Sequence, residues 1–355
     1  MRFKPIGWLI IFLLINFSAF AKDTNNADNT KTKFSAGHFI IEEVLDTYWW
    51  HIAKINDKEI AIPLPVIVHS KIRNQWFFFW SNKLFHGKEY KGFFINHHSP
   101  YKGKIVERDK NGEIIKPIDL SITKNVVASW ISIIIIFALF IPMGKKYKQN
   151  KLTIPKGINT LLEQIILFIR NNVARASIGD EKYEKFMPFL LSVFFFILIN
   201  NLLGLFPFFP GGANVTGNLA VTGVLAFFTF IITAINGTKD YWKHIFWNPD
   251  IPWWLKAPFP LIPFIELTGI FIKPTVLMIR LFANILAGHI VKVTFVSLIF
   301  IFAVFGIATA LGISVVSVLF IVFLTFLEIL VAFIQAYVFT FLSAIFFGMA
   351  AEQNH

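Results

Sequence analysis

The chain has 355 residues, of which 55% are hydrophobic and 43 are phenylalanine, and its formal net charge is +12. A soluble domain rarely has this composition. Several apolar runs reach the roughly 20 residues that cross a bilayer, so the sequence predicts an all-α polytopic membrane protein. In that class basic residues hold loops in the cytoplasm, so the charge does not indicate nucleic-acid binding. The absence of cysteine excludes disulfides and thiolate metal sites.

Residues 1–21 have the features of a secretory signal peptide. Arg2 and Lys4 precede a short apolar core, and Ala19-Phe20-Ala21 fits the small-x-small cleavage pattern. We expect cleavage after Ala21, and an uncleaved anchor helix is the alternative. In both cases the segment that follows begins outside the cytoplasm.

Residues 22–120 predict a small extracytoplasmic α+β domain with a polar, disordered start. The run "FIIEEVLDTYWWHI" has helical spacing, and it could lie on the membrane surface. The runs "EIAIPLPVIVHS" and "NQWFFFWSN" are typical of strands, and "DKNGEI" is typical of a hairpin turn.

We expect no metal and no cofactor. Six of the nine histidines lie in the N-terminal domain, and only the adjacent pair His97 and His98 suggests metal ligands. Surface or packing histidines are the simpler interpretation. The chain contains no glycine-rich phosphate-binding loop, so we expect neither direct nucleotide binding nor ATP hydrolysis by this chain.

Residues 121–355 predict the membrane domain. The loop at 144–185 holds nine Lys or Arg against four acids, which places it in the cytoplasm. Within it we expect an amphipathic helix at the membrane interface, with an apolar face formed by Leu161, Leu162, Ile165, Ile166 and Ile169. We expect five spans, at about 126–143, 186–206, 217–236, 261–305 and 313–350.

The last two apolar segments are too long for an upright span. A helix of about 38 residues is about 57 Å long, whereas the bilayer core is about 30 Å thick. Ordinary tilt does not absorb this difference. Gly306 and Gly312 bracket the turn between the two segments. We therefore expect a long, steeply tilted hairpin with a wide flank, and a C-terminus in the cytoplasm after five crossings.

Polar residues form stripes on both helices of this hairpin. Glu266, Lys273 and Arg280 are seven residues apart and share nearly one line, with Asn284 about 40° away and His289 on the opposite side. On the last helix, Thr325, Glu328 and Gln335 form a second stripe beside small residues. Antiparallel packing could bring His289 close to Glu328.

The chemistry of these residues suggests a charge barrier between two wet pathways. Arg280 does not deprotonate, so it can repel protons and attract a partner's carboxylate. His289 and Glu328 can relay protons in an outer pathway, where Asn284 and Gln335 order water, and Glu266 lies near the inner mouth.

Structural roles are the alternatives. Glu266 and Lys273 could snorkel, Arg280 could form a buried ion pair, and His289 could pair structurally with Glu328. Asn284 and Gln335, like Asn200 and Asn201 of the second span, could be interhelical hydrogen-bond donors.

The motifs "MIRLFANILAGH", "LEILVAFIQAYVFTFLSAIF", "FFFILINNLLGLFPFFPGGANVTGNLAVT" and "FIKP" resemble subunit a of bacterial F-type ATP synthase over residues 120–351. The resemblance implies a non-catalytic stator subunit in the bacterial inner membrane. It implies contact with a ring of c subunits and with the subunit b stalk, and two offset proton half-channels. By motif position, the resemblance makes Arg280 the essential arginine that faces the ring carboxylate. It assigns Asn284, His289, Glu328 and Gln335 to the outer half-channel, and Glu266 and Lys273 to the inner one.

Two departures from the family pattern bear on the site. Many relatives carry an acid at the position of His289 and a histidine at that of Glu328, so the pair looks exchanged here. Some relatives carry an aspartate where this chain has Gly204. The main competing hypothesis is a proton-coupled secondary transporter or a stand-alone proton channel, although the inverted repeats that favour a transporter are not evident. A receptor or assembly protein built around the N-terminal domain would leave Arg280 unexplained.

Overall fold

The computed structural model describes residues 46–55, 58–96, 101–109, 112–149, 157–206, 210–239, 241–243 and 261–351, with backbone only at 51–55, 58, 59, 86, 149, 261–267 and 289. The chain divides into two compact units, with the boundary between Lys124 and Asn125. Each unit has its own hydrophobic core.

The described part of the N-terminal unit consists of short antiparallel strands and one 3₁₀ helix. β1 (Trp49–Ile55) pairs with β2 (Lys58–Pro63). A second sheet has the order β4 (Gln75–Trp80), β3 (Pro65–Ser70), β8 (Ile118–Asp119). A third has the order β5 (Phe93–Ile95), β6 (Ile105–Arg108), β7 (Ile114–Ile115), and η2 (Ser81–Gly87) is the helix.

The strand predictions in this unit are confirmed, whereas the helix prediction is wrong from Trp49 onward. β3 alternates half-buried and buried side chains, and its buried Val66 and Val68 belong to the same hydrophobic core as Phe79 and Phe93. The turn "DKNGEI" connects β6 to β7 as a hairpin. Trp49 and Trp50 lie in β1 because aromatic side chains favour a pleated surface and β2 supplies the backbone partners.

The second unit is helical. Its elements are α3 (Lys124–Gln149), α4 (Ile158–Phe168), the π-helical η3 (Ile169–Arg175), α5 (Ala176–Ile178), α6 (Tyr183–Leu205), α7 (Leu219–Asn236), α9 (Leu261–Ala303) and α10 (Ile307–Ala351). Five of the described helices are long and apolar enough to cross a membrane: α3, α6, α7, α9 and α10. This agrees with the expected polytopic architecture.

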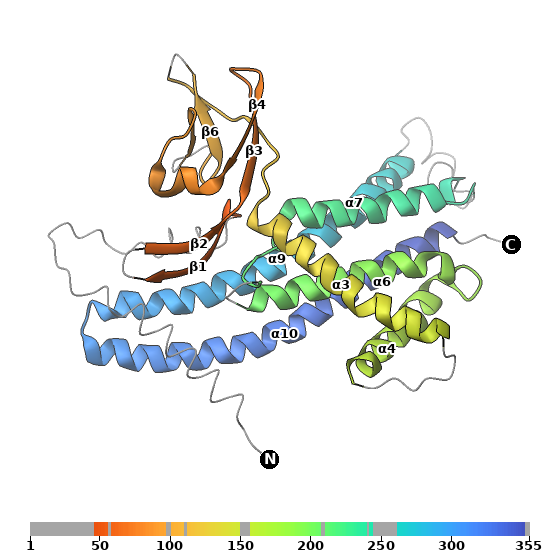
Figure 1. The fold of residues 1–355 in the computed structure, drawn as a ribbon. Coiled ribbons are helices and arrows are strands. Elements are labelled where there is room, and N and C mark those ends of the chain that lie inside the picture. The colour runs from red at the N-terminus through yellow and green to blue at the C-terminus, as the bar shows by residue number, and fades with distance from the viewer. Residues whose placement is uncertain are drawn as a thin grey trace. The chain divides into compact units, whose positions relative to one another are not determined.

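α9 and α10 run antiparallel, side by side, over most of their length (Figure 1). Gly306 makes the turn between them with φ of 126°, a conformation that L side chains rarely adopt. α10 already begins at Ile307, so Gly312 lies inside the helix rather than in the turn as expected. Pro274 lies inside α9 without ending it.

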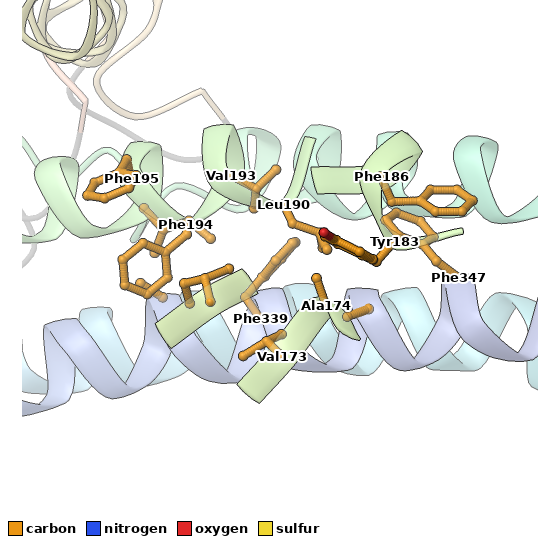
Figure 2. Packing of buried hydrophobic residues seen from close by; sticks show 14 of the residues in the cluster. Val173, Ala174, Tyr183, Phe186, Leu190, Val193, Phe194, Phe195, Phe339 and Phe347 are labelled. Carbon is orange, nitrogen blue, oxygen red and sulfur yellow. The ribbon is translucent and has the colours of Figure 1, made fainter. Parts of the chain in front are cut away.

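The core of this unit lies between α6, η3 and the second half of α10. Figure 2 shows Leu190 and Phe194 of α6 close to Phe339 of α10 and Val173 of η3. In the same core, the rings of Phe186 and Phe347 stack 4.9 Å apart. Of the predicted amphipathic face of α4, Leu162 is buried in this core, whereas Leu161 is 56% exposed.

Small residues let α10 approach its neighbours. Every fourth position from Ala332 to Gly348 holds a small residue: Ala332, Ala336, Thr340, Ala344 and Gly348. The first four are buried. Such spacing allows close helix contact inside a membrane, where van der Waals packing replaces the hydrophobic effect.

Candidate functional site

A small cavity with both polar and apolar residues in its lining lies where α6, the segment before α7, α9 and α10 meet. Its volume is about 40 Å³, and its polar lining consists of Asn200, Asn201, Asn214, Thr216, Asn284, Lys292 and Glu328. Since one water needs roughly 10–15 Å³ by this measure, about three fit. Gly204 also lines the cavity, so asparagines of α6, rather than an acid at that position, supply its polarity.

An ion pair closes one side of the cavity. Lys292 Nζ of α9 lies 2.6 Å from Glu328 Oε2 of α10, and the two side chains are 16% and 17% exposed. Gly288 lies one helical turn before Lys292. A Cβ at Gly288 would come within 2.7 Å of Glu328 Oε1, so the absence of a side chain there makes room for the carboxylate. Oε1 of Glu328 therefore faces the backbone at Gly288, and Oε2 faces the Lys292 ammonium.

Two asparagines of α6 connect the cavity to its surroundings. Asn201 Nδ2 donates to the Ala332 carbonyl of α10 at 3.3 Å, and its Oδ1 accepts from Thr216 Oγ1. Asn200 Nδ2 donates to Ser132 Oγ of α3 at 2.9 Å. Both residues thus act as interhelical hydrogen-bond donors, and both also line the cavity.

Three buried polar atoms of the lining residues have no hydrogen-bond partner among the described residues. They are Asn200 Oδ1, Asn214 Nδ2 and Glu328 Oε2, the last of which has the Lys292 ammonium beside it without hydrogen-bond geometry. A buried polar group without a partner costs about 1–3 kcal/mol. The size and chemistry of the cavity suit water molecules that satisfy these atoms.

Arg280 lies on a different face of α9. Its side chain is exposed, and none of the described side chains forms an ion pair or hydrogen bond with it. Lys273, seven residues earlier on the same line, is also exposed, with Nζ 5.9 Å from the centre of the Phe346 ring. Asn284, one turn after Arg280, lines the cavity.

The contacts between α9 and α10 give the register of the hairpin. Lys292 contacts Glu328, and Phe295 stacks on Phe320 at 5.2 Å. Continuing this antiparallel register places Arg280 level with residues 335–340 of α10, a stretch that begins with the buried Gln335. Glu328 lies seven residues away from Gln335, about 10 Å along the helix.

The structure therefore brings together some of the residues predicted from sequence. Asn284 and Glu328 share the cavity. The side chains of Glu266 and His289 lie outside the described residues, so the pairing of His289 with Glu328 stays a prediction. Within the described ranges, His, Asp and Glu form no group of three that could hold a metal.

Sequence reasoning missed Lys292, Asn214 and Thr216. Lys292 had a usable signal, because it is a charge inside a long apolar segment and lies four residues after Gly288, on the same helical face. Asn214 and Thr216 had none, because polar residues in a turn-rich loop look like ordinary loop composition.

Each of the two units matches a known protein family. Residues 126–348 match the family described as ATP synthase A chain, and residues 39–124 match a domain of unknown function. Proteins named ATP synthase subunit a are similar to this chain. One from Chlorobium phaeobacteroides is 42% identical over 76% of this chain and 78% of its own length. Another, from Chloroherpeton thalassium, is 43% identical over 67% and 69%. One from Myxococcus xanthus is 41% identical over 67% and 75%.

Proposed function

Taking as premise that this chain belongs to the ATP synthase subunit a family, the non-catalytic proton-translocating subunit of the membrane sector, we propose that Arg280 separates two proton half-channels beside a ring of c subunits. The observation that carries the proposal is Arg280, which is exposed in an apolar membrane helix and has no ion-pair partner among the described side chains. An arginine at bilayer depth costs about 3 kcal/mol or more unless a partner compensates it.

A carboxylate on another chain is the partner that fits Arg280. A guanidinium stays charged and forms bidentate pairs with carboxylates. α10 exposes large apolar side chains from its first half up to the level of Arg280, including Leu319, Phe326 and Ile334. A wide apolar flank next to a fixed cation suits a neighbouring ring of membrane helices, each with one acid. The arginine then draws the proton-free carboxylate to itself and bars a direct proton leak.

The cavity belongs to the outer half-channel in this proposal. Asn284, His289, Glu328 and Gln335 carry protons from the outer side to the ring, with water in the cavity linking them. Glu266 and Lys273 line the inner half-channel. Asn284 supports a path from the cavity toward the ring, because it lines the cavity and lies one turn from Arg280.

The proposed orientation follows from the charges of the loops. Residues 144–185 and the C-terminus lie in the cytoplasm, and the N-terminal unit lies outside it after removal of residues 1–21. The subunit b stalk is the expected second partner, holding the chain still while the ring turns.

Replacing Arg280 tests the proposal. We expect Arg280→Ala to abolish proton-driven ATP synthesis in inverted vesicles, because the ring carboxylate loses its counter-charge. Arg280→Lys should fail largely too, since a lysine can lose its proton in a dry site. Arg108→Ala is the matched control, because it removes an exposed arginine from the N-terminal unit. Wild-type synthesis by Arg280→Ala, at equal amounts of assembled complex, would contradict the proposal.

A further inference from the structure

Lys292 is the one charged side chain that the described structure places against Glu328. Its ammonium lies 2.6 Å from the carboxylate, and both groups face a cavity with room for about three waters. A pair of this kind, mostly removed from solvent, needs good geometry and further polar neighbours to offset its desolvation. The amide groups of Asn200 and Asn201 supply such neighbours.

Without the ammonium, the same cavity would be a cation site. It would offer a carboxylate, the free Oδ1 of Asn200 and water, and hard metal cations prefer oxygen ligands of this kind. The ammonium occupies the place beside the carboxylate that a sodium ion would take. It is covalently fixed to α9, so a sodium ion cannot displace it by diffusion.

Lys292 is distinct from the barrier proposed at Arg280. The two residues are twelve positions apart on α9, which is about 18 Å along the helix axis and about 120° around it. Arg280 is exposed, whereas Lys292 contacts a residue of its own chain. Arg280 and Lys292 therefore have different surroundings although they lie on one helix.

We propose that Lys292 is the built-in counter-ion of Glu328 and makes the cavity selective for protons over sodium ions. The proposal rests on the proposed function, because it assigns the cavity to the proton pathway. Protons pass through hydrogen-bonded water and side chains without a hydrated ion occupying the cavity. Lys292 acts as a positioning residue that holds the carboxylate and excludes competing cations, and it relays nothing itself.

The test measures passive proton conductance of the ATP synthase complex that contains this chain, in vesicles freed of the catalytic head. Sodium chloride is compared with choline chloride at equal concentration on both sides. We expect equal conductance in the two salts for the wild type. In Lys292→Met the bare carboxylate binds sodium, and a sodium concentration about twice the dissociation constant should lower conductance about threefold by mass action.

Two control variants separate charge from packing. Lys292→Arg keeps the cation and should restore the equal conductance of the wild type. Lys185→Met removes an exposed lysine from the first turn of α6 and should not create sodium sensitivity. If Lys292→Met does not assemble, Lys292→Gln carries the same expectation, because its amide has no charge.

Conductance of Lys292→Met and Lys292→Gln that is equal in the two salts would overturn the proposal, as would sodium sensitivity of the wild type. Failure of the proposed function would look different. It would appear as wild-type vesicles that conduct no protons at all, or as full ATP synthesis by Arg280→Ala.

Discussion

Glu328 is held from two sides by residues of α9, and this explains how a carboxylate persists in an apolar helix. Lys292 neutralises its charge, and Gly288 leaves room for its second oxygen. His289 is adjacent to Gly288 in the chain and three residues before Lys292. In the proposed outer pathway, this imidazole exchanges protons with Glu328.

At the residue scale, we predict that His289 and Glu328 contribute jointly to proton conductance. His289→Ala and Glu328→Ala should each slow proton conductance without preventing assembly, because each removes one proton-relaying group from the proposed outer pathway. The exchange of His289→Glu with Glu328→His keeps one acid and one base in the same space. It should therefore retain more conductance than the two single substitutions predict together. The measurement is passive conductance of head-free vesicles for both single substitutions and the double.

Strict additivity of the two losses would mean that His289 and Glu328 act independently. The shared outer pathway would then have to be abandoned. The amount of assembled complex in each membrane is the control, since a loss of assembly would lower conductance without any effect on proton transfer.

At the scale of elements, the stripe of small residues at every fourth position of α10, from Ala332 to Gly348, determines how closely α10 packs against its neighbours. At one end of the stripe, the Ala332 carbonyl accepts a hydrogen bond from Asn201. At the other end, a Cβ at Gly348 would clash with the Ser177 carbonyl oxygen of α5. The cavity thus depends on packing over the whole second half of α10, because the stripe sets the distance between α6 and α10.

Gly348→Ala should destabilise the subunit, because the added methyl group meets a backbone atom that cannot rotate away. Overpacking of this kind costs about 1–3 kcal/mol. Gly312→Ala is a matched control in the same helix, since a Cβ there meets nothing within 4 Å. The measurement is the thermal unfolding midpoint of the detergent-solubilised complex. Equal midpoints for the two variants would contradict the packing of α10 described above.

At the scale of the whole molecule, the charges of the loops predict which parts face each side of the membrane. The chain has no cysteine, so single cysteines can be labelled without background. Lys88→Cys in the N-terminal unit should react with an impermeant maleimide in intact spheroplasts. Glu181→Cys, before α6, should react only after permeabilisation. Both positions are exposed, so burial does not limit labelling. The reverse pattern would overturn the proposed orientation.

The sequence by itself determined the class of the protein, the strands around "EIAIPLPVIVHS", the long hairpin and the candidate residues Arg280 and Glu328. These features follow from local composition and from the spacing of apolar and polar residues along the chain, and both can be read directly from the sequence. Only the tertiary structure decided that Trp49 and Trp50 lie in a strand, because pairing with β2 outweighed helical spacing. It also decided that Glu328 meets Lys292 and that Asn214 and Thr216 join the cavity. Those contacts join separate helices and a loop, so they depend on a register and a packing distance that no single segment encodes.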